Sequence, residues 1–136
     1  MSPVRRLDHL AIVVTDIEEA LAFWRDALGL EVSEVAEVPR ERSAIAFLPL
    51  ENGEIELVQP TDEASGVARY LSKRGPGMHH ICLEVDDLDA MLQRLKERGV
   101  QLINPEPVAK ENGVRYAFIH PKSAFGVLVE LYEKPR

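Results

Sequence analysis

Residues 8–14, D-H-L-A-I-V-V, recur as H-H-I-C-L-E-V at residues 79–85. His9 thereby matches His80, at an offset of 71 residues. The same offset relates further pairs along both segments: Val14 with Val85, Asp16 with Asp87, and Phe47 with Phe118. Because the same offset relates residues from His9 as far as Phe47, the chain is interpreted as two copies of one supersecondary unit.

Each copy has the sequence pattern of one strand, one helix and three further strands. Asp16 and Asp87 follow the apolar opening strands and can cap a helix N-terminus. Apolar residues then recur at helical spacing up to Gly29 and Gly99, where a left-handed residue would end each helix. Short strands are expected at Glu31–Ala36, Ser43–Leu50 and Ile55–Gln59, then at Val100–Ile103, Arg115–His120 and Val127–Tyr132.

The pattern predicts an α+β fold of two tandem βαβββ modules. Repeat one covers about residues 5–60, a linker helix about 61–76, and repeat two about 77–133. A module of roughly 65–70 residues buries little core by itself. We therefore expect one pseudo-symmetric mixed-sheet domain over residues 1–136, rather than two independent domains.

Composition excludes several classes of protein. The 136 residues are 46% hydrophobic and 29% charged, with a net charge of −7, which disfavours nucleic acid as a partner. The single cysteine, Cys82, cannot form an intramolecular disulfide. No apolar run approaches the roughly 18 residues of a membrane span, and the N-terminus lacks a signal-peptide pattern. We expect a soluble, cytoplasmic protein.

The repeat also pairs residues that can bind a metal. His9 and His80 lie on the first strand of each copy, and Glu56 and Glu130 lie on the last. A lone histidine or glutamate is more often a core, surface or solvated residue. Two of each in matching positions instead predict a divalent metal site, with N and O ligands that suit Zn, Co, Ni or Mn.

Other polar residues have weaker patterns. His79 should face away from His80, which favours a structural role, and His120 before Pro121 is typical of a turn. Cys82 lies on an apolar strand and is interpreted as a small buried hydrophobe. Lys122 and Ser123 form a polar loop before the strand of Glu130, where they could bind a substrate phosphate or be a solvated turn.

The paired units with these histidines and glutamates resemble the vicinal oxygen chelate (glyoxalase/bleomycin resistance/dioxygenase) superfamily. Within it, nearly the whole chain resembles the methylmalonyl-CoA epimerase family. The strings that carry this resemblance are D-H-L-A-I-V-V, I-E-L-V-Q-P, G-M-H-H-I-C-L-E-V-D-D-L and G-V-R-Y-A-F-I-H-P-K-S…G-V-L-V-E-L.

The resemblance implies that His9, Glu56, His80 and Glu130 are the metal ligands. It implies an isomerase that interconverts (R)- and (S)-methylmalonyl-CoA by abstracting the C2 proton through a metal-stabilised enolate, with Glu130 as one acid/base. The family's other catalytic glutamate aligns without a gap on Arg40, so Glu41, one residue on, is the candidate for that role. Lys122 and Ser123 are the candidate substrate-binding residues.

Two alternative functions stay open from the sequence. A glyoxalase I-type lactoylglutathione lyase would use the same four ligands, and turnover of methylglyoxal with glutathione would identify it. A metal-free small-molecule binding module would not need four ligand-type residues in matching positions. The superfamily's usual assembly also implies a homodimer.

Overall fold

The computed structural model of the protein describes residues 3–135, which fall into two compact units. Unit 1 contains the chain up to His9 and from His80 onward, and unit 2 contains Leu10–His79. The boundaries therefore cut through two strands, β1 (Val4–Val13) and β5 (Gly77–Val85). One consequence is that unit 1 joins the start of the first sequence repeat to the second repeat.

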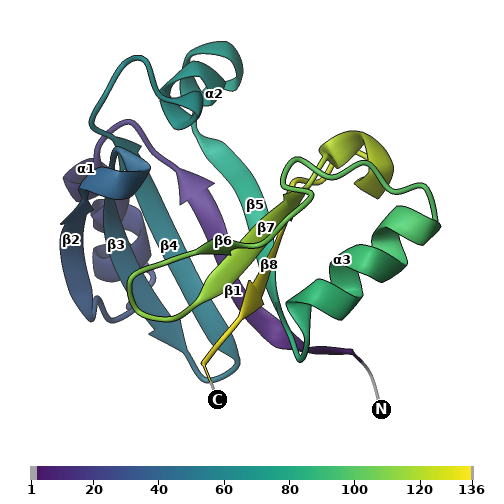
Figure 1. The fold of residues 1–136 in the computed structure, drawn as a ribbon. Helices are drawn as coiled ribbons and strands as arrows, with labels where there is room; N and C mark the ends of the chain where they lie inside the picture. The colour runs from purple at the N-terminus through teal and green to yellow at the C-terminus, as the bar shows by residue number, and fades with distance from the viewer. Residues whose placement is uncertain (1–2, 136) are drawn as a thin grey trace. The chain divides into compact units, whose positions relative to one another are not determined.

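The strands and helices confirm the mixed α+β fold (Figure 1). In unit 2, hydrogen-bonded neighbours follow the order β2 (Glu34–Val38), β3 (Ser43–Leu50), β4 (Gly53–Pro60) and the later part of β1. In unit 1, the order is the start of β1, then β5, β8 (Val129–Glu133), β7 (Arg115–Ile119) and β6 (Val108–Ala109). The helices are α1 (Ile17–Leu21) and α2 (Gly66–Arg74) in unit 2, and α3 (Leu88–Glu97) in unit 1.

The sequence repeat reappears in the pairing of strands. In unit 2, Phe47 of β3 is opposite Glu56 of β4, and in unit 1 Phe118 of β7 is opposite Glu130 of β8. The next residues form equivalent pairs too: Ala46 with Leu57, and Ala117 with Leu131. Both hairpins therefore align corresponding positions of the repeat, although the offset is 71 residues for the two phenylalanines and 74 for the two glutamates.

Each of these hairpins has one face covered by a helix. In unit 1, Leu131 and Ala117 pack with Leu88 and Leu92 of α3. In unit 2, Leu57 and Ala46 pack in the same way with Ile17 and Leu21 of α1. Successive strand residues point to opposite faces, so Glu56 and Glu130 lie on the face that their own unit's helix leaves uncovered.

The two repeat helices begin with the same set of hydrogen bonds. The carboxylates of Asp16 and Asp87 accept from the backbone N–H three residues on, at 3.0 Å in both helices, as predicted for N-caps. The first helical N–H of α1, at Ile17, donates to Gln59, and that of α3, at Leu88, donates to Glu133. Gln59 and Glu133, the second acceptors, each come three residues after the glutamates that the repeat pairs, Glu56 and Glu130. They tie the start of each helix to the last strand of its repeat.

The structure corrects three details of the predicted elements. The helix expected from Ile17 to Leu28 becomes a π-helix over Ala22–Ala27, where the Leu28 N–H donates to the Phe23 carbonyl, and Leu28 is consequently exposed. The strand expected at Val100–Ile103 is reduced to one bridge, from Leu102 to Ile119, while Val108–Ala109 pairs with β7 further along the same edge. The two-residue strand β6 was not predicted.

The expected chain reversals are present. Gly29 and Gly99 follow their helices with positive φ angles of 89° and 75°, as a left-handed helix end requires. Asn52-Gly53, a pair typical of two-residue turns, lies between the expected strands Ser43–Leu50 and Ile55–Gln59, and the structure has a hairpin there, although Gly53 pairs with Leu50 and so belongs to β4. Within residues 3–135, no helix is long and apolar enough to cross a membrane.

Candidate metal centre

Three strands of unit 1 bring together two histidines and a glutamate. Glu130 of β8 is the parallel partner of Cys82 on β5, so both side chains lie on the same face. His80 precedes Cys82 by two residues on β5 and shares that face. His9 joins them from β1 and is the last residue of that strand that belongs to unit 1.

The ligand-type atoms of these residues converge. His80 Nε2 lies 3.1 Å from Glu130 Oε1, His9 Nε2 lies 3.5 Å from the same oxygen, and the two Nε2 atoms are 3.3 Å apart. Each residue offers one ligand atom, and all three atoms lie within 4.8 Å of one another. This cluster, His9–His80–Glu130, is called the triad below.

The triad is buried, and its carboxylate is charged. His9 is 1% exposed and Glu130 is 5% exposed. Burial disfavours ionisation of Glu130, but hydrogen bonds with His80 and His9 outweigh it and lower the pKa of Glu130 to about 2. At neutral pH the triad therefore combines an ionised oxygen ligand with two imidazoles.

These residues fit a divalent cation. Two imidazole nitrogens and one carboxylate oxygen are a common ligand set for first-row transition metals. A bound cation would also neutralise a buried carboxylate, whose charge is otherwise costly to bury. The donor set therefore matches the divalent metal site predicted from the repeat, for three of the four predicted ligands.

Sequence analysis missed one residue next to the triad, Asp8. Its Oδ2 lies 2.8 Å from His9 Nδ1, and its Oδ1 lies 2.9 Å from Lys134 Nζ. Burial acts against its charge, but hydrogen bonds with His9 and Lys134 lower the pKa of Asp8 to about 2. The signal available in the sequence was the adjacent Asp-His pair, which strand alternation would have assigned to opposite faces.

The fourth predicted ligand and the candidate acid/base belong to unit 2. Glu56 is on β4, half-buried and opposite Phe47. Glu41 is exposed and ends a 3-10 turn, Pro39–Glu41, that joins β2 to β3. A shift of one residue along a strand would turn a side chain to the opposite face of the sheet. Because Arg40 and Glu41 lie in a turn and not in a strand, this objection to Glu41 does not apply. The roles of Glu56 and Glu41 stay predictions.

The predicted substrate loop is a second 3-10 turn, Pro121–Ala124. His120 caps it by accepting from the Lys122 N–H at 3.0 Å, which confirms the turn interpretation of that histidine. The Ser123 hydroxyl accepts from the Gln101 N–H at 2.8 Å, so it helps hold the chain here, and the Lys122 side chain is exposed. Substrate binding by Lys122 and Ser123 stays a prediction.

Two residues have the structural roles that the sequence favoured. The His79 ring lies edge-on to Tyr70, with centroids 4.8 Å apart. Cys82 is fully buried, and burial raises the pKa of its thiol to about 12, although its hydrogen bond with His9 acts in the opposite direction. Cys82 therefore lies beside the triad as a protonated thiol, not as a thiolate ligand.

Comparison with known proteins agrees with this fold. The model of the glyoxalase/bleomycin resistance protein/dioxygenase superfamily matches residues 8–118, and the chain belongs to this superfamily. Within it, the chain is 42% identical over 130 residues to the ethylmalonyl-CoA/methylmalonyl-CoA epimerase of Cereibacter sphaeroides, covering 94% of this chain and 97% of that protein.

Two solved structures extend the similarity to three dimensions. Methylmalonyl-CoA epimerase from Mycobacterium tuberculosis superposes with a TM-score of 0.88 at 37% identity, covering 100% of this chain and 92% of that one. A methylmalonyl-CoA epimerase in complex with methylmalonyl-CoA and NH4+ superposes with a TM-score of 0.86 at 31% identity, covering 96% and 95%. The resemblance found in the sequence is thus confirmed.

Proposed function

We propose that this protein is an epimerase that interconverts (R)- and (S)-methylmalonyl-CoA by removing and returning the C2 proton. The observation that carries this function is the buried triad, in a chain that matches named epimerases of this substrate over more than nine-tenths of its length. The similar structure with bound methylmalonyl-CoA supports a CoA thioester as the substrate class.

The reaction sets two requirements for the protein. C2 of the substrate lies between a thioester carbonyl and a carboxylate, so loss of its proton places negative charge on the thioester oxygen. A divalent cation held by the triad would supply Lewis-acid stabilisation of that charge. Inversion at C2 also needs a proton acceptor on one face of that carbon and a donor on the other.

The chain's own residues can meet both requirements. His9 and His80 would hold the cation through their Nε2 atoms, with Glu130 and, as the fourth ligand, Glu56. Their N and O donor set favours Co, Mn, Ni or Zn. Glu130 is also proposed as the acid/base on one face of C2, the role that the resemblance to the epimerases implies. Glu41 is proposed for the other face.

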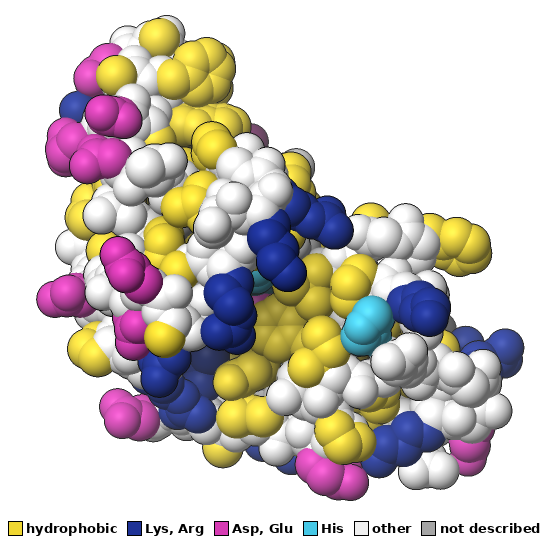
Figure 2. All heavy atoms as spheres, turned by 90° about the horizontal axis from the view of Figure 1, so that it is seen from above, with side chains coloured by type: hydrophobic (Ala, Val, Ile, Leu, Met, Phe, Trp, Pro, Cys, Tyr) yellow, Lys and Arg dark blue, Asp and Glu magenta, His cyan; other side chains and the backbone are white. Residues whose placement is uncertain are grey.

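Cations are available for an anionic thioester despite the net charge of −7. Figure 2 shows Lys and Arg side chains standing directly beside hydrophobic ones on the face that it draws. The exposed Lys122 is the candidate to bind a phosphate of CoA. Its backbone N–H is already fixed by His120, so the turn presents this side chain from a defined position.

The test of function is deuterium incorporation at C2 of methylmalonyl-CoA in D2O, measured with metal-loaded protein and with chelator. We expect exchange with metal and a loss of about 100-fold or more on chelation or in Glu130→Gln. Turnover of methylglyoxal with glutathione is measured in parallel. Lyase activity without C2 exchange would overturn the epimerase assignment in favour of a lactoylglutathione lyase, and neither activity would overturn both enzyme assignments.

The role of Glu41 has a separate test. Replacing Glu41 with Gln keeps its size but removes its ability to accept a proton, so epimerisation should fall by about 10²–10⁴-fold. Exposed Glu37 of β2 provides the matched control as Glu37→Gln. If Glu41→Gln retained full epimerisation and full C2 exchange, another residue would be the second acid/base. The cytoplasmic location and the homodimer stay predictions.

A further inference from the structure

A continuous line of polar contacts in unit 1 connects the triad to a lysine near the C-terminus. Lys134 Nζ lies 2.9 Å from Asp8 Oδ1, and Asp8 Oδ2 lies 2.8 Å from His9 Nδ1. The opposite nitrogen of the same ring, His9 Nε2, faces Glu130 Oε1 at 3.5 Å. The imidazole of His9 thus has a carboxylate at each of its two nitrogens.

These two carboxylates favour opposite tautomers of a neutral ring. Asp8 favours a proton on Nδ1, whereas Glu130 favours a proton on Nε2. The contact to Asp8 is shorter by 0.7 Å, from the distances of 2.8 and 3.5 Å. In the neutral ring we expect the proton to stay on Nδ1, so that Nε2 no longer donates to Glu130 and its lone pair is directed at the centre of the triad. A proton on Nε2 would block that nitrogen as a ligand.

Asp8 is itself held in place by cations. Besides Lys134 at 2.9 Å, Arg6 approaches the same Oδ1 at 3.3 Å. The Asp8 side chain is only 13% exposed, so these contacts are partly shielded from water. With Oδ1 occupied by the lysine, Oδ2 is the oxygen left for the histidine.

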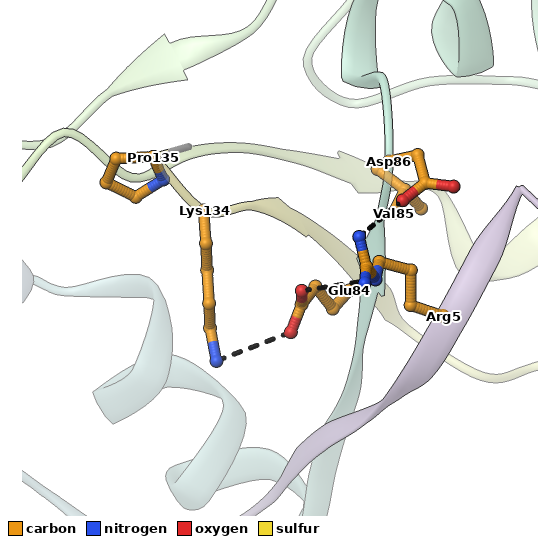
Figure 3. Close-up of a pocket in the computed structure, with 6 residues that line it drawn as sticks. All are labelled: Arg5, Glu84, Val85, Asp86, Lys134 and Pro135. Atoms are coloured by element: carbon orange, nitrogen blue, oxygen red, sulfur yellow. Dashed lines mark hydrogen bonds and ion pairs between the residues drawn. The ribbon is translucent and has the colours of Figure 1, made fainter.

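Lys134 lines an open pocket on unit 1 with a volume of about 440 Å³ (Figure 3). Within the pocket its ammonium also faces Glu84, with Nζ and Oε1 3.4 Å apart. Arg5 contacts Asp86 there at 2.9 Å and Glu84 at 3.9 Å. Lys134 therefore bridges Glu84 of the pocket and Asp8, the carboxylate that contacts His9.

This arrangement is specific to the first copy of the repeat. The 71-residue offset that relates His9 to His80 relates Asp8 to His79. His79 cannot supply a carboxylate, and its ring contacts Tyr70 instead. The two triad histidines, although equivalent in the repeat, are thus oriented by different neighbours.

From these contacts, we propose that Asp8 and Lys134 are positioning residues that fix the Nδ1–H tautomer of His9 and so present Nε2 as a metal ligand. This proposal rests on the metal site of the proposed function. It assigns the tautomer of one metal ligand, His9, to residues outside the triad. Partners of this kind commonly contribute 10–100-fold in metal affinity at other histidine sites.

The experiment measures the tautomer and the metal affinity separately. The tautomer is read from the ¹⁵N shifts of His9 in metal-free protein at alkaline pH, where the ring is neutral, and Co²⁺ affinity is read from a spectroscopic titration. Asp8→Ala should shift His9 towards the Nε2–H form and weaken Co²⁺ binding by about 10–100-fold. Asp8→Asn keeps the size of the side chain and a neutral acceptor, so its Co²⁺ affinity and its His9 tautomer should lie between those of Asp8→Ala and the wild type. This variant replaces Asp8→Ala in the test if Asp8→Ala does not fold.

Lysine variants test the second contact. Lys134→Met should weaken Co²⁺ binding by on the order of threefold to fivefold, as expected for one partly exposed ion pair, and Lys134→Arg should restore it. Glu84→Gln is the matched control, since it removes a carboxylate from the same charge cluster without touching His9. It should leave both the tautomer and the affinity unchanged.

Two results would overturn the proposal: an unchanged His9 tautomer in Asp8→Ala, or an equal loss of Co²⁺ affinity in Glu84→Gln, which would indicate a general effect of charge. Failure of the proposed function looks different. Wild-type protein that binds Co²⁺ but does not exchange the C2 proton would overturn the epimerase assignment while leaving the tautomer result intact.

Discussion

Glu130 owes its charge to its neighbours. A carboxylate that is 5% exposed would ordinarily have a raised pKa, yet the pKa of Glu130 falls to about 2 because two histidines hydrogen-bond with it. The sequence repeat predicted that Glu130 and His80 belong to one site. The proximity of Asp8 to His9, which determines how that histidine is oriented, depends on side-chain conformation and could not be predicted.

Cys82 gives a prediction for a single residue. The thiol is fully buried, and burial raises its pKa to about 12, so in the folded protein it should be neither accessible nor ionised. Reaction with a disulfide reagent should be slower in native protein than in denatured protein by on the order of 100-fold. Exposed Ser72 supplies the control, as Ser72→Cys in a Cys82→Ala background. Fast labelling of native wild-type protein would contradict the prediction.

The repeat is expressed most clearly at the level of elements, in how α1 and α3 begin. An aspartate caps each helix, and a side chain from the last strand of the repeat accepts the first helical N–H: Gln59 at 2.9 Å and Glu133 at 2.8 Å. The caps were predictable because they act within three residues. The second acceptors were not, because they come from a strand 42 and 45 residues further along the chain.

Exchanging these second acceptors tests their role. Gln59→Leu leaves the Ile17 N–H without its acceptor and should lower the free energy of unfolding by about 1–2 kcal/mol, measured by urea denaturation. Gln59→Glu supplies the acceptor used in the second repeat and should cost much less. If the two variants were equally destabilised, the hydrogen bond to Ile17 would not account for the loss.

The start of α3 also gives a prediction about pH. A hydrogen bond with Arg115 of β7 lowers the pKa of Asp89 below its ordinary value of 3.8. A carboxyl whose pKa is lower in the folded state stabilises the fold above its ordinary pKa, and this contribution is lost as pH falls through the folded value. The small difference in melting temperature between wild type and Asp89→Asn should therefore be present at neutral pH and vanish in acid. A difference that persisted unchanged in acid would contradict this prediction.

For the whole molecule, the division into units differs from the division into sequence repeats. His9 comes from the first repeat, yet it lies in unit 1 with His80 and Glu130 of the second. The triad therefore requires strands β1, β5 and β8 to be assembled together, and an unfolded chain cannot hold its three ligand atoms within 4.8 Å.

Metal binding should consequently stabilise the folded protein. A ligand that binds only the folded state adds about 2.7 kcal/mol to its stability at 100 times the dissociation constant. The melting temperature should thus rise with Co²⁺, Mn²⁺, Ni²⁺ or Zn²⁺ and return to its metal-free value when a chelator is added. His80→Ala should lose most of this shift. An equal shift in that variant would locate the bound metal outside the triad.

The sequence by itself determined the repeat, the α+β class, the pairing of histidines with glutamates and the helix caps. All of these follow from short-range chemistry or from the correspondence between the two copies: Phe47 and Phe118, for example, face Glu56 and Glu130 at matching positions, although the connection between the paired strands is longer in the second copy. The family resemblance also came from such local strings.

Tertiary structure decided what depends on distant segments. The residue pattern did not predict the π-helix over Ala22–Ala27 or the single bridge that replaces the Val100–Ile103 strand. The contacts of His9 are of the same kind: Lys134 and Asp8 are 126 residues apart, and only the folded strands bring them within 2.9 Å. A repeat can specify which residues correspond, but the distances between side chains are fixed only when the strands that carry them are aligned.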